Sequence, residues 1–152
     1  VCQRDFKLPQ LMLNAKVFGD FNLRQMLDST TGSLMLHPKT DSANFGGLYF
    51  KPNLQITGLA TKGQVIGCDH QCAVYTGICS PHQLWVDKLH QARKKHPNDL
   101  LCMIRHGLLP AIAQDPTHAS AVLHRGDWCE ISTPQRITEA AKWLQSPASH
   151  AN

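Results

Sequence analysis

Apolar residues in the first half of the chain follow the two-residue period of β-strands. Short apolar or β-branched runs lie between residues 33 and 79, and glycine, proline or asparagine residues separate them. Such close spacing predicts antiparallel hairpins. Upstream, the alternation of residues 10–18 predicts another strand, and the apolar positions of residues 21–27 predict a short helix. The strands expected in the hairpin region are residues 34–36, 47–50, 54–57, 64–66 and 73–78.

The period changes after Cys79 to the 3.6 residues of a helix. In three places a capping side chain is followed by proline, which is typical of a helix start. The apolar run of residues 100–104 predicts a buried strand after the first helix, and residues 128–131 predict a short strand before the third. The second helix is expected to end near Arg125. The three helix starts are Ser80-Pro81, Asp115-Pro116 and Thr133-Pro134.

These elements predict an α+β fold built on a single mixed sheet. Antiparallel hairpins from the first half and a β-α-β-α-β-α alternation in the second half join one sheet, with the helices packed on it. The 152 residues suit a single domain, residues 1–152, in which residues 146–152 form a frayed polar tail. A small β-barrel followed by a helical tail is the alternative architecture.

Composition and charge exclude several classes of protein. With 42% hydrophobic residues, the chain is expected to be globular rather than disordered, collagenous or coiled-coil. The net charge of +4 is split evenly between the two halves, so the sequence shows neither a basic arm for nucleic acid nor a polybasic membrane anchor. No apolar run approaches the ~20 residues of a membrane helix, and no signal peptide is visible. Cysteines within apolar runs suit a reducing compartment, so a soluble cytoplasmic protein is expected.

Polar residues that suit an anionic ligand follow three of the predicted strands. In an open sheet, ligands bind beyond the carboxyl ends of parallel strands, so these residues are expected to share one rim. Arg105 can clamp two oxygens of an anion, and Ser80 and Thr133 lie at helix starts whose backbone N–H groups favour phosphate. His82 and His106 can move a proton and are the candidate catalytic residues. In the structural alternative, Ser80 and Thr133 only cap helices and the two histidines lie on solvated loops.

The sequence therefore predicts a protein that binds a phosphate-bearing ligand, a nucleotide or a nucleic acid, and that is a candidate hydrolase. Whether it is an enzyme stays open, because phosphate-loop, dinucleotide-binding, zinc-protease and serine-hydrolase motifs are all absent. The alternative function is a non-catalytic interaction or accessory module with a protein partner. No membrane partner is expected. Trp128 is interpreted as a core residue or, if exposed, as a platform for a base or ring.

Cysteine and histidine residues with zinc-like spacing form the densest cluster of metal-capable groups. Three residues separate Cys68 from Cys72, and two separate Cys79 from His82, and both spacings fit local ligand pairs of a tetrahedral zinc site. Zinc is therefore the candidate cofactor, as a structural ion of the interaction module. A disulfide between Cys68 and Cys79, or unligated thiols throughout, are the alternatives.

Overall fold

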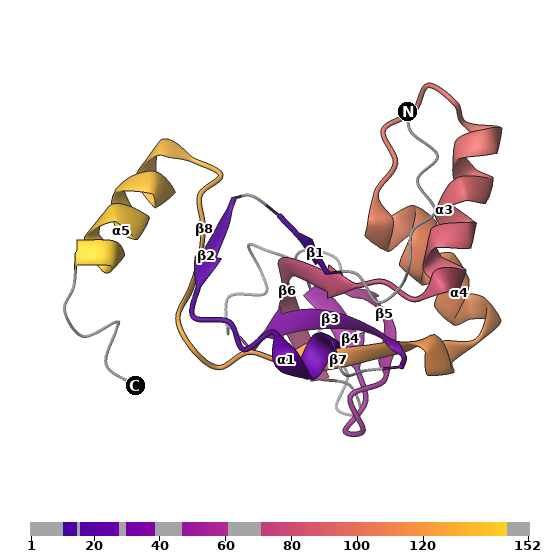
Figure 1. The fold of residues 1–152 in the computed structure, drawn as a ribbon, viewed down its shortest axis with the longest axis horizontal. Helices are drawn as coiled ribbons and strands as arrows, with labels where there is room; N and C mark the ends of the chain where they lie inside the picture. Colours follow the sequence, from indigo (N-terminus) through magenta and orange to yellow (C-terminus); the bar gives the residue numbers. More distant parts are fainter. Residues whose placement is uncertain (1–10, 15, 28–29, 39–46, 61–70, 146–152) are drawn as a thin grey trace.

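The main sheet of the computed structural model, which describes residues 11–14, 16–27, 30–38, 47–60 and 71–145, has the strand order β5-β4-β6-β3-β7 (Figure 1). Strand β1 pairs with β6 outside this path. Every paired neighbour is antiparallel except β3 with β7, which run parallel. The predicted α+β class, with one mixed sheet and helices packed on it, is confirmed. The strands of this sheet are β1 (Met12–Leu13), β3 (Gly32–His37), β4 (Gly47–Phe50), β5 (Ile56–Ala60), β6 (Gln71–Ser80) and β7 (Ala119–Leu123).

A short antiparallel ribbon of β2 (Val17–Gly19) and β8 (Trp128–Glu130) leads from the sheet to helix α5 (Pro134–Gln145). Figure 1 shows α5 beyond this ribbon, at the end of the molecule opposite α3 and α4. Among the described helices, none combines the length and the apolar character needed to cross a membrane. The other helical segments are α1 (Arg24–Leu27), α3 (Gln83–Lys95), the π-helix η1 (Met103–Leu108), α4 (Leu109–Gln114) and the 3-10 turn η2 (Pro116–His118).

Alternate side chains of β3 enter two separate hydrophobic cores. Leu34 and Leu36 are fully buried in the larger core together with Trp85 of α3. Met35 packs in a smaller core with Met26 of α1. Because successive side chains of a strand point to opposite faces, one short strand joins both cores. Helices α3 and α4 with η1 therefore cover one face of the sheet, and α1 covers the other.

Most predicted elements of the first half, and several of the second, are confirmed. The expected strand at residues 10–18 is divided into β1 and β2, because the chain leaves the main sheet after Asn14 to pair with β8. The expected strand at residues 64–66 and the expected tail at residues 146–152 lie outside the described residues. Residues 34–36, 47–50 and 73–78 fall in β3, β4 and β6, residues 54–57 and 128–131 overlap β5 and β8, and the helices expected near residues 21, 81 and 134 are α1, α3 and α5.

Two segments of the second half contradict the predicted β-α-β-α-β-α alternation. Residues 100–104 do not form a buried strand, since Leu100 is 98% exposed and the segment leads into η1. A short apolar run does not distinguish a buried strand from a buried helix. The helix expected after Asp115 is only the single turn η2, and Ala119–Leu123 then form β7 because they pair with β3. In this segment, long-range pairing outweighs the local helix signal.

Strand β6 bends at an irregularity opposite β3. Leu34 and Leu36, two positions apart in β3, pair with residues of β6 that are four positions apart. The Thr76 hydroxyl supplies a replacement bond by donating to the Met35 carbonyl at 3.0 Å, and Gly77 takes a φ of +92°. This bulge lies beside the cavity described below, so it shapes one of the cavity walls.

Replacing Gly77 with alanine is expected to lower the free energy of unfolding by about 2 kcal/mol or more. A φ of +92° is unfavourable for residues with a Cβ, and the added Cβ would lie 2.9 Å from Cβ of Asn14. Urea denaturation measures the loss. Gly58→Ala is the matched control, because an added Cβ there meets no atom within 4 Å. Its free energy of unfolding is expected to change by less than about 0.5 kcal/mol, and equal losses in both variants would contradict the strain at Gly77.

Candidate functional site

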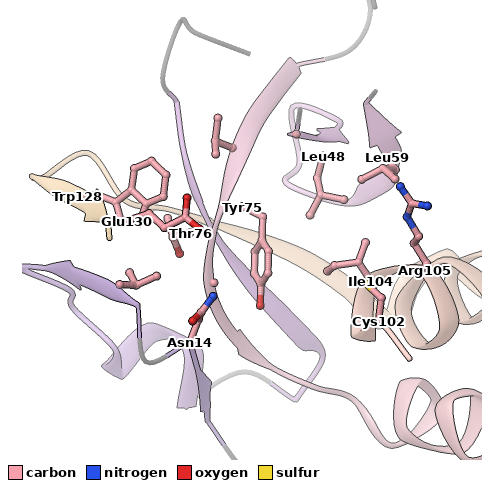
Figure 2. A pocket seen from close by; sticks show the side chains of 14 residues that line it. Asn14, Leu48, Leu59, Tyr75, Thr76, Cys102, Ile104, Arg105, Trp128 and Glu130 are labelled. Atoms are coloured by element: carbon pink, nitrogen blue, oxygen red, sulfur yellow. The ribbon is translucent and has the colours of Figure 1, made fainter. Parts of the chain in front are cut away.

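A cavity opens where two strands leave a gap along one edge of β6. On the edge away from β3, β4 pairs with residues 71–73 of β6 and β1 pairs with residues 78–79. Val74, Tyr75, Thr76 and Gly77, between these two pairings, line a cavity of about 340 Å³ (Figure 2). Next to β1, the Asn14 N–H donates to the Gly77 carbonyl at 2.9 Å. The volume lies in the range of small-molecule sites.

Side chains from three distant parts of the chain line the cavity. Asn14 follows β1, Trp128 and Glu130 belong to β8, and Arg105 belongs to η1. Figure 2 shows Arg105 on the opposite side of Tyr75 from Trp128 and Glu130. The polar groups are therefore divided between two ends of the cavity. The apolar part of the lining includes Val17, Leu48, Leu59, Val74 and Ile104.

The two ends of the cavity carry opposite charges. Arg105 is exposed, and its guanidinium makes no hydrogen bond or ion pair with another residue that the structure describes. Glu130 is half-buried, and its Oε2 accepts a hydrogen bond from Arg136 Nη1 at 2.8 Å. One end therefore offers an available cation, and the other offers a carboxylate held in place by an ion pair. This arrangement suits a ligand with an anionic group at one end and neutral polar groups at the other.

Tyr75 forms an uncharged wall between these two ends. Burial raises the pKa of the Tyr75 hydroxyl well above its ordinary value, and the neighbouring Cys79 thiol raises it further. Burial also raises the pKa of the Cys79 thiol. Both groups therefore stay protonated at neutral pH, and the charges of the described cavity wall come from Arg105 and Glu130.

A π-helix, rather than the end of a strand, presents Arg105 to the cavity. At the end of η1, the Leu109 N–H bonds to the Ile104 carbonyl, five residues back. Helical segments of this kind are rare and are frequent at functional sites. Leu108 of η1 is fully buried in the larger core with Trp85. The position of Arg105 therefore depends on the packing of η1 against α3.

The residues predicted to share one rim lie in separate regions of the structure. Because β6 is antiparallel to β3 and β7 is parallel to β3, the carboxyl end of β6 lies at the same edge of the sheet as the amino end of β7, with β3 between them. Ser80 and His82 are at that edge, Arg105 and His106 are in η1, and Thr133 caps α5 by accepting the Arg136 N–H. Only Arg105 of these residues lines the cavity. The roles assigned to the other four in binding and proton transfer stay predictions.

Sequence reasoning missed Asn14 and Glu130 of the cavity lining and left the role of Trp128 open. Asn14 follows a two-residue strand and carries no local signal of function. Glu130 was available as one of two glutamates in the chain, and it lies just before a helix start. Trp128 was weighed as a ring-stacking platform, and it is half-buried with one ring face stacked on His37. Pairing of β1 with β6 places Asn14 at the cavity, and pairing of β2 with β8 places Trp128 and Glu130 there; the sequence encodes neither pairing locally.

The proposed zinc ligands do not come together. Cys72 and Cys79 are seven positions apart in β6, a separation of about 23 Å along an extended strand. A zinc–sulfur bond is only about 2.3 Å, so one ion cannot bind both thiols. Cys79 is also a free thiol rather than half of a disulfide, and Cys68 lies outside the described residues. Within the described ranges, no three histidine, cysteine or acidic residues are placed to hold a metal.

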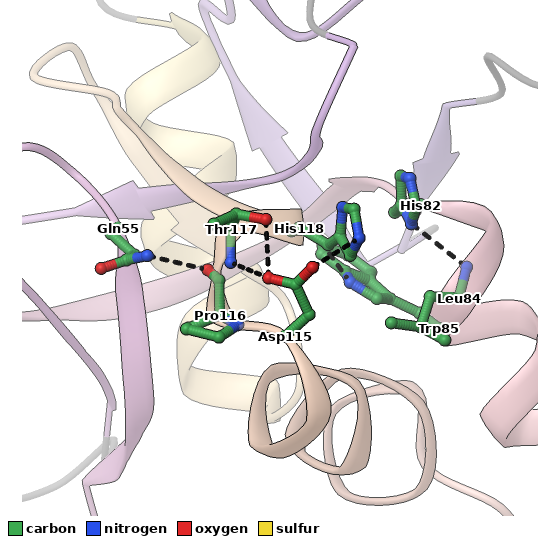
Figure 3. A network of polar contacts seen from close by, with 8 residues as sticks. All are labelled: Gln55, His82, Leu84, Trp85, Asp115, Pro116, Thr117 and His118. Carbon is green, nitrogen blue, oxygen red and sulfur yellow. Dashed lines mark hydrogen bonds and ion pairs between the residues drawn. The ribbon is translucent and has the colours of Figure 1, made fainter.

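His82 does not line the cavity and belongs instead to a polar network at the start of α3 (Figure 3). Its Nδ1 accepts the Leu84 N–H at 3.2 Å and so caps α3 in place of the predicted Ser80. Its ring stacks on that of His118, with the centroids 4.1 Å apart, and His118 Nε2 lies 3.1 Å from Asp115 Oδ2. Burial, followed by the nearby His118, lowers the pKa of His82. The cap therefore relies on a neutral imidazole.

Stability is expected to fall below neutral pH because of His82. Its pKa in the folded chain lies under the ordinary value of 6.5, so the unfolded chain binds more protons as the pH falls. The contribution is complete above about pH 6.5 and is lost as the pH falls through the folded pKa. His82→Asn keeps a capping side chain without a titratable ring, so its stability is expected to change less between pH 7.5 and pH 5. Urea denaturation at the two pH values measures the free energy of unfolding of the wild-type chain and of the variant. An equal loss of stability in both proteins would contradict the role of His82.

Comparison with known proteins gives a fold but no family. No family model matches the sequence, and no curated protein matches it. The fold resembles that of a protein assigned as a glucose-1-phosphate thymidylyltransferase from Bacillus anthracis, solved with sucrose, with a TM-score of 0.67 and 13% identity over 93% of this chain and 55% of that chain. UTP-bound UGPase from Acinetobacter baumannii matches with a TM-score of 0.61 and 16% identity, over 91% and 52% of the two chains.

HddC from Yersinia pseudotuberculosis is similar in fold, with a TM-score of 0.57 and 12% identity over 88% of this chain and 54% of that chain. It has also been solved with GMP-PN, where the TM-score is 0.56. The chain therefore spans about half the length of the solved structures that it matches. Identities of this size show a shared fold alone.

Proposed function

We propose that this chain binds a phosphorylated sugar in the cavity beside β6. The observation that carries the proposal is the Arg105 guanidinium, which lines the cavity without a partner among the described residues. The resemblance to proteins named for glucose 1-phosphate and found with sucrose, UTP or GMP-PN supports a ligand of this class. Because the chain spans about half of those proteins, we propose for it the binding of the sugar phosphate rather than a complete transfer reaction.

Arg105 binds the phosphate in this account. A guanidinium offers two parallel N–H donors to the oxygens of a phosphate, and it stays charged at every physiological pH. The neighbouring lining of Leu48, Leu59 and Ile104 is apolar, so little competes for the phosphate there except water. Exclusion of some of that water by the ligand strengthens the interaction.

Glu130 and Asn14 bind sugar hydroxyls at the other end. A carboxylate has about four lone-pair positions, and Arg136 uses Oε2 of Glu130, so acceptor positions remain for hydroxyl donors. Trp128 adds a flat apolar surface of the kind that packs against the C–H face of a sugar ring. The carboxylate also repels a phosphate, which fixes the direction in which the ligand lies.

Calorimetric titration with glucose 1-phosphate, glucose, inorganic phosphate and UTP tests the proposal. Glucose 1-phosphate is expected to bind more tightly than glucose or inorganic phosphate, because only it reaches both ends of the cavity. Saturation at 100 times its Kd should raise the free energy of unfolding by about 2.7 kcal/mol. If millimolar glucose 1-phosphate gives no heat of binding and does not raise the free energy of unfolding, the proposal is contradicted. Tighter binding of UTP alone would assign the cavity to a nucleotide instead.

A further inference from the structure

Two hydrogen bonds join the residues on either side of Arg105. The Cys102 N–H donates to Nδ1 of the His106 ring at 2.8 Å, and the His106 N–H donates to the Cys102 carbonyl at 2.9 Å. Together these bonds close a ring that contains Met103, Ile104 and Arg105. We refer to residues 102–106 as the Arg105 clamp.

The clamp forms one wall of the cavity. Cys102, Ile104 and Arg105 all line it, whereas His106 does not. Behind the clamp, η1 packs closely on α3, since a Cβ added to Gly107 would lie 3.0 Å from the backbone carbonyl oxygen of Trp85. The carboxyl-terminal part of η1 is thus held by packing. In the amino-terminal part, which carries Arg105, the Met103 and Ile104 side chains pack against the larger core, and the His106 ring accepts the backbone N–H of Cys102.

The backbone N–H groups at the start of η1 require hydrogen-bond acceptors from outside the helix. The first N–H groups of a helix have no partner within the helix. Cys102 stands at the cap position, and its own side chain makes no capping bond. The ring of His106, four residues along, accepts one of these N–H groups, that of Cys102 itself. An uncapped helix start frays readily, and a side chain displaced by about 1 Å loses much of its effect on a bound group.

We propose that His106 is a positioning residue that aims Arg105 at the phosphate of the ligand. This inference rests on the function proposed above. Its ring acts through the backbone of the Arg105 clamp and does not touch the ligand. Because Nδ1 accepts the Cys102 N–H, the proton of the neutral ring is on Nε2.

Two substitutions of His106 separate this role from a general structural one. His106→Asn keeps an acceptor, since the Asn Oδ1 reaches the position of Nδ1, and it is expected to retain glucose 1-phosphate affinity within about 2-fold. His106→Leu removes the acceptor, and it is expected to weaken glucose 1-phosphate about 10-fold while leaving glucose unchanged. Amide hydrogen exchange at Cys102, measured without ligand, should be fast in the leucine variant and slow in the asparagine variant.

A double-mutant cycle with Arg105→Ala closes the test. If His106 acts through Arg105, the Arg105→Ala/His106→Leu protein binds glucose 1-phosphate no more weakly than Arg105→Ala alone. Additive losses, or equal affinities of the asparagine and leucine variants, would overturn the positioning role while leaving the proposed function intact. Failure of the wild-type chain to bind glucose 1-phosphate would overturn both.

Discussion

Glucose 1-phosphate is expected to bind the Arg105→Ala variant about 10- to 100-fold more weakly than the wild-type chain. Hydrogen bonds to a charged group contribute about 1.5–3 kcal/mol, which corresponds to that loss of affinity. Arg105 is exposed and makes no polar contact with another described residue, so the free energy of unfolding should change by less than about 0.5 kcal/mol. Calorimetric titration and urea denaturation measure the two quantities.

Arg125→Ala provides the matched control for this experiment. Arg125 is also exposed, but it follows β7 and does not line the cavity. Its removal changes the net charge by the same amount, and salt screens an exposed charge beyond about 8–10 Å. Affinity for glucose 1-phosphate is therefore expected to stay within about 2-fold in this variant. Equal losses in both variants would assign the effect to overall charge and would contradict direct contact by Arg105.

Trp85→Ala is expected to produce the largest loss of stability, about 3–5 kcal/mol. Trp85 is fully buried in the larger core, and its indole N–H donates to the His118 carbonyl at 3.1 Å. The backbone fits closely around it, since a Cβ added to Gly32 would lie 2.5 Å from the indole ring. A cavity at this position would be difficult to fill by collapse, and the loss is a large part of the stability of an ordinary domain.

Trp85→Phe separates packing from hydrogen bonding at this site. Phenylalanine keeps most of the apolar volume but cannot donate to the His118 carbonyl, so a smaller loss of about 1–3 kcal/mol is expected. Urea denaturation of both variants measures the difference. A loss below 1 kcal/mol in the alanine variant would contradict a central role of Trp85 in joining α3 to the sheet.

Short sequence patterns predicted the elements that depend on neighbouring residues, such as α3 and β4. Pro81, the apolar stripe and the basic end predicted α3, and turn residues around residues 47–50 predicted β4. Strand β7 was missed because Ala119–Leu123 follow a helix-start signal at Asp115, whose carboxylate caps only the turn at Thr117. The residues become a strand through pairing with β3, more than 80 positions earlier in the chain.

The candidate site was predicted less well than the fold because it depends on strand direction. Arg105 was expected at a strand end and instead lines the cavity from a π-helix. His82 was expected beside it, but the antiparallel course of β6 places His82 next to His118. Asn14 and Glu130 meet at the cavity only after β1 and β2 pair with different partners. Neither the direction of β6 nor these partners can be read from a single segment.

Alkylation of Cys102 tests most directly whether the ligand occupies the cavity beside β6. Cys102 is an exposed thiol in the cavity wall. Cys129 is the internal control, because its neighbours Trp128 and Glu130 line the cavity and strand alternation turns Cys129 away from it. Peptide mass spectrometry gives the alkylation rate of each thiol separately.

Glucose 1-phosphate is expected to slow the alkylation of Cys102, with half-maximal protection at the Kd found by calorimetry. The alkylation rate of Cys129 should stay the same at every ligand concentration. Saturating glucose 1-phosphate that leaves the Cys102 rate unchanged would contradict the account and would place binding elsewhere on the molecule.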